Sequence, residues 1–331
     1  MSTIRSRATI RSTGMSVPEK VVTNADFERI VDTSDEWITT RTGIKERRMC
    51  AEGQNTADMA ADACRRALAD AALDALDVDI LILSTATPDH LLPATACETQ
   101  ALIGCEKAAA FDISAACAGW LYGVSLADAM VTSGMHENIL VVGSEKMSAI
   151  LDYTDRTTCV LFGDGAGAAL IQRGDGNGRG ILATHMRTNG RQARLLWRPA
   201  GGAALPSTEQ TRSERMEFVK QEGREIFKHA VMAMEDSCRQ VLAAADLAIS
   251  DIDLVIPHQA NIRIIDGVTK RLGVEEERVF VNIDRYGNTS SASIPIALDE
   301  ARRQGRIGAG STILMTAFGG GLAWGASVIV L

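Results

Sequence analysis

The sequence predicts an α/β fold made of two similar halves. Helix and strand signals alternate along the whole chain, which favours this class over an all-helical or all-strand protein. Each half contains a strand, a glycine-rich turn and a second strand, with the turns at 163–167 and 319–321. Glycine is abundant at 29 residues, whereas Phe, Trp and Tyr number only 7, 4 and 3. Because small residues let backbones approach closely, we expect tightly packed layers with buried helices.

The first half contains helices and buried strands in turn. Its alanine-rich start has helical spacing, and Gly134 is a suitable residue to end the last helix. The predicted elements are a helix at 56–73, a strand at 79–84, a helix at 94–103, a strand at 108–113, a helix at 118–133 and a strand at 138–143.

The second half repeats this order. The glycine-rich run 174–180 is too flexible for the interior of an element, so we place the boundary there and predict halves at 1–176 and 177–331. The irregular stretch 187–215 is long enough to be a functional or mobile loop. The predicted elements are a helix at 218–245, a strand at 253–256, a helix at 262–272, a strand at 279–281, a helix at 291–304 and a hairpin of 312–316 with 326–330.

Composition excludes several classes of protein. The formal charge of −8 argues against a general nucleic-acid binder, whose binding surface is basic. No apolar run approaches the ~20 residues that span a bilayer, and no apolar segment follows Arg5 and Arg7 as in a secretory signal. The 7 cysteines are odd in number and form no CxxC pair, which predicts reduced thiols and a cytoplasmic protein. No metal-ligand cluster has useful spacing.

Three residues are candidates for catalysis. Cys117 lies where a strand ends and a helix begins, and a helix N-terminus favours the nucleophilic thiolate. His258 follows a strand, and sites in α/β proteins gather at the carboxyl ends of strands. Asn288 precedes Thr289 and Ser290, which by themselves are typical of a turn and a helix N-cap.

Two other site classes share part of this pattern. Papain-like hydrolases also use Cys, His and Asn at a similar Cys-to-His interval, but their C-G-[SA]-C-[WY] sequence is missing here. The glycine-rich turn at 163–167 lacks the register of a dinucleotide-binding motif, and the chain has no P-loop. A tight turn is the better interpretation of this segment.

The chain resembles the β-ketoacyl-acyl-carrier-protein synthase III family, the initiating condensing enzymes of type II fatty-acid synthesis. The resemblance implies a thiolase fold, with duplicated halves in α-β-α-β-α layers, and a homodimer. It covers essentially the whole chain and rests on segments in this order: 33–44, the stretch around Cys117, Asp155-Arg156, 162–167, 257–261, 286–290 and 318–321.

The resemblance also implies a role for each matching position. Cys117 takes the acyl group from acyl-CoA, and His258 and Asn288 then stabilise the enolate formed from malonyl-acyl-carrier protein. No cofactor or metal is needed, because acyl-CoA is a substrate. The implied oxyanion hole consists of the Cys117 and Gly320 N–H groups, and the implied CoA-binding residues are Trp37, Arg41, Arg156, Gly223, Phe227 and Asn261.

Two further surfaces follow from the resemblance. Lys228, Arg263, Lys270 and Arg271 are implied in docking the acidic carrier protein. Leu92 and Phe318 are implied in the acyl pocket, with Leu92 reaching into the partner subunit. Acetyl-specific members of the family have Phe at the position of Leu92, so we expect this chain to accept longer or branched primers.

Two alternative functions remain at this level. Condensing or acyl-transfer enzymes of specialised metabolism on the same fold share the Cys-His-Asn set. A non-catalytic acyl-CoA-binding homologue belongs to a different class, and it would not need a nucleophile.

Overall fold

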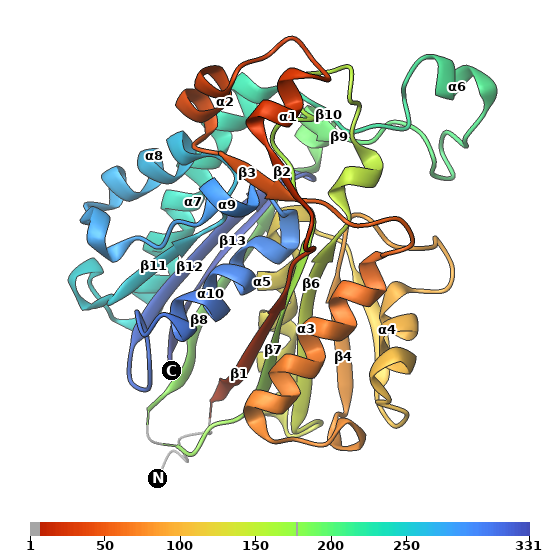
Figure 1. Cartoon of the computed structure of the whole chain (residues 1–331). Coiled ribbons are helices and arrows are strands. Elements are labelled where there is room, and N and C mark those ends of the chain that lie inside the picture. The colour runs from red at the N-terminus through yellow and green to blue at the C-terminus, as the bar shows by residue number, and fades with distance from the viewer. Residues whose placement is uncertain (1–6, 177) are drawn as a thin grey trace.

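Two β-sheets form the frame of the protein in this computed structural model, which describes residues 7–176 and 178–331 (Figure 1). Within these residues one sheet has five strands in the order β1-β7-β6-β4-β5, and the other has four in the order β11-β12-β13-β8. The strands of the first sheet are β1 (Ala8–Ser16), β4 (Ile80–Ser84), β5 (Ala109–Ile113), β6 (Asn138–Glu145) and β7 (Gly165–Arg173). Those of the second sheet are β8 (Gly180–Thr188), β11 (Leu254–Pro257), β12 (Thr312–Gly319) and β13 (Ala323–Val330).

The two sheets have the same connectivity. In the first, β4 runs parallel to β5 and β6, and β7 runs antiparallel to β6 and β1. In the second, β11 runs parallel to β12, and β13 runs antiparallel to β12 and β8. A single parallel bridge from Val255 to Val279 stands where β5 stands in the first sheet. The predicted duplication is therefore confirmed, whereas the predicted strand 279–281 is reduced to this bridge.

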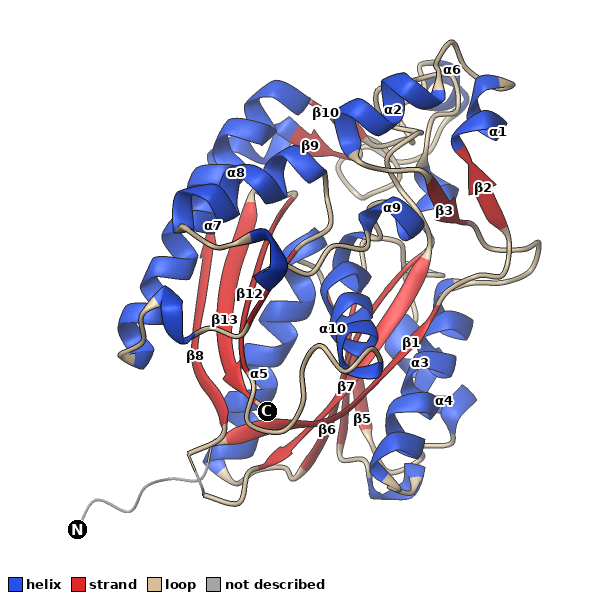
Figure 2. Cartoon of the chain, turned by 60° about the vertical axis from the view of Figure 1, so that its left-hand side comes forward, coloured by secondary structure: helices blue, strands red, loops and turns tan. Residues whose placement is uncertain are grey.

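Helices fill the space between the sheets and cover both outer faces, which gives the predicted α-β-α-β-α layers (Figure 2). α5 (Gly119–Ser133) and α10 (Ser293–Arg303) lie in the middle and contact both sheets. α3 (Thr56–Ala71) and α4 (Thr95–Ile103) cover the first sheet on its other side. α7 (Gly223–Ala245) contacts the outer face of the second sheet, and α8 (Ile262–Leu272) packs on α7.

Residue alternation within the buried strands explains these layers. In β4, Ile80 and Ile82 join the core between the sheets, whereas Leu81 and Leu83 join the core beneath α3 and α4. Side chains of a strand point alternately to its two faces, so a strand buried on both sides is apolar throughout.

A smaller group of elements lies above the carboxyl ends of the parallel strands (Figure 1). Residues 198–219 leave the body as an excursion that carries α6. The elements of this group are β2 (Val21–Thr23), α1 (Asn24–Glu28), α2 (Asp35–Thr42), β3 (Glu46–Arg48), β9 (Leu196–Trp197), α6 (Glu209–Ser213), β10 (Lys220–Gln221) and α9 (Ile283–Tyr286).

Several element boundaries differ from the sequence predictions. The predicted helix 218–245 begins only at Gly223, because Lys220 and Gln221 pair as a strand with β9. β1 and β8 were not predicted as strands. The boundary between halves falls between β7 and β8 and stays a prediction, and Asn177 lies outside the described residues.

The two halves meet closely where β7 crosses α10. A Cβ at Gly167 would lie 2.7 Å from the Ile296 nitrogen and 2.7 Å from the Pro295 Cβ. We expect Gly167→Ala to lower the free energy of unfolding by about 1–3 kcal/mol or more, because backbone and ring atoms have no room to move. Thermal denaturation measures this effect. Gly202→Ala is the matched control, since nothing lies within 4 Å of its Cβ, and an equal loss in both variants would contradict the account.

Candidate active site

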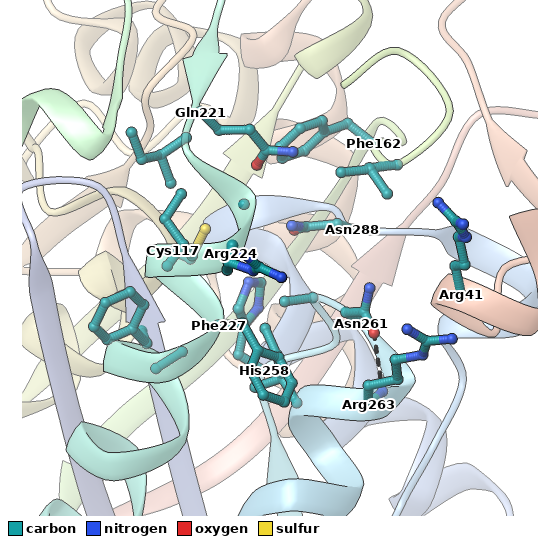
Figure 3. Close-up of a pocket in the computed structure, with 18 of the residues that line it drawn as sticks. Arg41, Cys117, Phe162, Gln221, Arg224, Phe227, His258, Asn261, Arg263 and Asn288 are labelled. Atoms are coloured by element: carbon teal, nitrogen blue, oxygen red, sulfur yellow. Dashed lines mark hydrogen bonds between the residues drawn. The ribbon is translucent and has the colours of Figure 1, made fainter. Parts of the chain in front are cut away.

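A cavity of about 620 Å³ brings together residues from both halves of the chain (Figure 3). Cys117 follows β5, His258 follows β11, and Asn288 follows α9. All three line this cavity. Because parallel strands present their carboxyl ends at the same edge of a sheet, the fold gathers these three side chains from distant parts of the sequence.

The backbone around Cys117 is fixed by a close contact with the second half. Cys117 lies in the short 3₁₀ turn Ala116–Ala118, directly before α5. A Cβ at Gly319 would lie 2.6 Å from the Cys117 nitrogen and 3.0 Å from the Cys117 Cβ. Only glycine allows β12 to end this close to the nucleophile.

Burial keeps the thiol of Cys117 protonated. Burial raises the pKa of Cys117 to about 12, and the carboxylate of Glu145 acts in the same direction. The Ser290 hydroxyl, 3.6 Å from Sγ, has a smaller opposing effect on this pKa. The helix N-terminus was expected to favour a thiolate, and burial acts against it at this position, because loss of water disfavours the charged form.

The imidazole of His258 is buried and neutral. Its backbone N–H donates to the Thr316 carbonyl at 2.8 Å, and the residue is 1% exposed. Burial lowers the pKa of His258 to about 3. Neither ring nitrogen is bonded within the part of the chain that the structure describes. The ring is thus able to donate one hydrogen bond and accept another from a molecule in the cavity.

Asn288 offers hydrogen-bond donors to the cavity. Its Oδ1 accepts a hydrogen bond from the Ser290 backbone N–H at 2.9 Å, so its amide nitrogen is the group that remains for a ligand. Thr289 occupies the N-cap position of the 3₁₀ turn Ser290–Ala292, as the sequence indicated, but its side chain makes no cap bond. The Ser290 hydroxyl donates to Glu145.

A cation–π cluster lies near the cavity. The Arg41 and Arg156 guanidinium carbons lie 4.5 and 5.3 Å from the Trp37 ring centroid. Arg156 also donates to the Asp32 carbonyl at 2.6 Å. Arg41 lines the cavity, whereas Trp37 and Arg156 do not.

Other implied residues divide into two groups. Asn261 lies in the cavity and caps α8, accepting from the Arg263 N–H at 2.9 Å. Cavity-lining residues that were also expected from the sequence are Gly223, Phe227, Asn261, Arg263 and Phe318. Those outside its lining are Gly320, Leu92, Lys228, Lys270 and Arg271.

Sequence reasoning missed Gln221 and Arg224, which also line the cavity. No sequence pattern marked them, because both residues fell inside the segment 218–245, which was predicted as one continuous helix.

Neither a metal-binding cluster nor a membrane-spanning helix occurs in the described residues. No group of three or more His, Cys, Asp or Glu is arranged to hold a metal there. No helix in the same residues is long and apolar enough to cross a bilayer.

Comparisons with known proteins agree with this geometry. Family models described as 3-oxoacyl-[acyl-carrier-protein] synthase III match residues 111–190, and 242–331 for its C-terminal part. The chain is 50% identical over 322 residues to a β-ketoacyl-[acyl-carrier-protein] synthase III from Caldanaerobacter subterraneus, covering 97% of each. The chain belongs to this synthase III family. It is a condensing acyltransferase with the thiolase fold.

Solved structures of the family share the whole fold. The synthase III of Aquifex aeolicus is 47% identical with a TM-score of 0.90, over 98% of this chain and 100% of that one. The priming β-ketosynthase of the R1128 polyketide pathway is 34% identical with a TM-score of 0.91, over 99% and 97%. Fatty-acid and polyketide members of the family therefore share this architecture.

The glycine contact at the nucleophile generates a prediction. In this synthase, Gly319→Ala would push β12 away from the Cys117 backbone, so we expect acyl transfer to Cys117 to slow by at least about tenfold, since small displacements of reacting groups are costly. Stopped incubation with acyl-CoA followed by intact-protein mass spectrometry measures the rate. Gly308→Ala is the control, because nothing lies within 4 Å of its Cβ. Unchanged acylation in the folded Gly319 variant would contradict this account.

Proposed function

We propose that this chain condenses an acyl-CoA primer with malonyl-acyl-carrier protein and so initiates fatty-acid synthesis. The observation that carries the proposal is the shared cavity of Cys117, His258 and Asn288. The Cys117 sulfur attacks the thioester carbonyl and CoA leaves as its thiol, taking up the proton that Cys117 gives up. Malonyl-acyl-carrier protein then loses CO₂, and its carbanion attacks the acyl carbon and displaces the Cys117 sulfur, which takes up a proton from water to restore the thiol.

His258 and Asn288 stabilise the enolate that decarboxylation produces. The neutral imidazole of His258 and the free amide of Asn288 both offer N–H donors to a negative oxygen. Neutral donors in a dry cavity need no counter-ion and little rearrangement when the charge develops. The Cys117 and Gly320 N–H groups serve the tetrahedral intermediate as its oxyanion hole.

The CoA nucleotide binds at the cation–π cluster by the cavity. Arg41 meets its phosphates with a planar guanidinium that suits them. For the adenine ring to enter between Trp37 and Arg156, Arg156 has to leave its contact with Asp32, because 5.3 Å leaves no room for a third plane. Gly223 and Phe227 line the pantetheine path, and Asn261 supports His258.

The carrier protein docks beside the cavity on basic side chains. Arg263 and Lys270 form no salt bridge with any described residue. Lys228 and Arg271 are already paired, with Glu225 at 2.8 Å and Glu235 at 2.9 Å. The first two are therefore the stronger attachment points for an acidic partner.

A homodimer in the cytoplasm is the working form of this enzyme. β5 is an edge strand, and Leu91 and Leu92 nearby are 83% and 88% exposed. Large exposed apolar side chains beside an unpaired edge are typical of an interface. Leu92 lies outside its own chain's cavity, which supports a place for it in the partner's acyl pocket.

The condensation assay tests the proposed function. Wild type is expected to form β-ketoacyl-carrier protein and CO₂ from acyl-CoA and malonyl-carrier protein. Cys117→Ala is expected to form no product. His258→Ala and Asn288→Ala should still acylate Cys117 but lose condensation by about 10²–10³-fold each, as for other lost oxyanion donors.

Controls separate the alternatives. Cys238→Ala removes another buried thiol outside the cavity and should keep activity. Acyl-Cys117 without condensation would favour a transferase, and binding without acylation would favour a non-catalytic homologue. Absence of product from wild type would overturn the proposal.

Primer choice tests the role of Leu92. We expect wild type to use isobutyryl-CoA or octanoyl-CoA as well as acetyl-CoA. Leu92→Phe should narrow this range by filling the acyl pocket, whereas Leu91→Phe, at a similarly exposed neighbour, should not. Relative kcat/KM for the three primers measures this effect, and strict acetyl preference in wild type would contradict it.

A further inference from the structure

A fully buried carboxylate lies behind the nucleophile and has no part in the chemistry described above. Glu145 ends β6 and is 0% exposed. It does not line the cavity. A buried carboxylate is costly unless hydrogen bonds satisfy it, so its retention beside the active site requires an explanation.

The two oxygens of Glu145 bind the two halves of the chain separately. Oε2 accepts from the Ala86 N–H at 2.9 Å and from the Thr85 and Thr87 hydroxyls at 3.2 and 2.8 Å. Oε1 accepts from the Ser290 and Ser291 hydroxyls at 2.9 and 2.8 Å. Glu145 is therefore held rigidly at the junction where the catalytic groups meet.

Ser290 connects this carboxylate to the nucleophile. Its Oγ lies 2.9 Å from Glu145 Oε1 and 3.6 Å from Cys117 Sγ. Its backbone has φ +50°, in the left-handed region that serine rarely adopts, and its N–H donates to Asn288. Strained backbone of this kind persists only where the surroundings enforce it, and it gathers at functional sites.

We propose that Glu145, acting through Ser290, is a positioning residue that holds the Cys117 thiol as a hydrogen-bond donor and opposes its ionisation. The number of hydroxyl hydrogens decides which group donates. Ser290 has one hydroxyl hydrogen, which it gives to Glu145, so its oxygen is left to accept the S–H of Cys117. A thiolate would require Ser290 to turn that hydrogen toward sulfur and give up its bond to Glu145.

Charge acts in the same direction as this hydrogen bonding. Burial raises the pKa of Glu145, whereas its hydrogen bonds from Ala86, Thr87, Ser290 and Ser291 favour the charged form. A second negative charge beside it in a dry interior is unfavourable. Among the described residues, the other titratable group that shares the cavity with Cys117 and is itself buried is His258, which is neutral. The Lys146 ammonium next to Glu145 in sequence donates to Asn55 at 3.1 Å instead.

The inference rests on the proposed function, because a protonated thiol matters for the acyl transfer from CoA. The thiol stays protonated until an acyl-CoA is in place, so the same proton is available to the departing CoA sulfur. A protonated thiol also resists oxidation between turnovers, because oxidation follows thiolate character.

Alkylation of Cys117 tests the inference without any substrate. Iodoacetamide reacts with the thiolate, so its rate against pH, followed on the Cys117 peptide by mass spectrometry, reports ionisation. Glu145→Gln removes the charge and frees the Ser290 hydroxyl for sulfur, so we expect a fall of about one unit in the pKa and about tenfold faster alkylation at pH 8. Ser290→Ala removes both the acceptor of the Cys117 S–H and the link to Glu145, so we expect faster alkylation in this variant as well.

Matched variants separate positioning from loosening of the fold. Ser291→Ala removes a hydroxyl from the same Glu145 oxygen without touching sulfur, and Glu145→Asp retains the charge. Both should alkylate within about twofold of wild type. Equal rates in wild type and folded Glu145→Gln, or the same change in both serine variants, would overturn the inference. If Glu145→Gln does not fold, the contrast between the two serine variants decides. Failure of condensation with these shifts present would overturn only the proposed function.

Discussion

The close approach of the β12 backbone to the Cys117 turn is the constraint on which the site depends. The nucleophile belongs to the first half of the chain, whereas His258 and Asn288 belong to the second. They share a cavity because Gly319 lets the two halves touch backbone to backbone at this point. Gly143 does the same at the other side of the junction, where a Cβ would lie 2.4 Å from the Ser291 carbonyl oxygen. Duplication supplies the two sheets. Glycines at their contact let the backbones approach closely enough for both halves to contribute to one active site.

Neutrality is the second property that unites the site. Burial keeps the Cys117 thiol protonated and the His258 imidazole uncharged, and Asn288 contributes an amide. Negative charge therefore develops beside these three side chains only as the substrates react, where unsolvated donors interact strongly with it. The buried carboxylate of Glu145 is separated from sulfur by the Ser290 hydroxyl. Hydrogen bonds, rather than ion pairs, therefore orient the polar groups around the nucleophile.

Patterns of apolar residues predicted the parts of the fold that are buried on both sides. Helix 262–272 was predicted with its observed bounds, and β4 within one residue. β1 was missed because its polar Ser12 and Thr13 are fully buried and bonded to Ala67 and Asp299, which are far away in sequence. The same limit applies to the site. Motifs identified many of the residues that line the cavity. The protonation of the Cys117 thiol and the Glu145–Ser290 contact depend on burial, which no local sequence pattern encodes.

Peptide mapping of the acyl-enzyme tests the central claim most directly, because the chain offers 7 thiols and only one lies in the shared cavity. Wild-type protein is incubated with an acyl-CoA, quenched, digested and analysed by mass spectrometry. The account predicts one acyl group per chain, located on the peptide that contains Cys117, while the half-buried Cys50 and exposed Cys97 remain unmodified. An acyl group on one of those cysteines, or no acyl-enzyme at all, would contradict it.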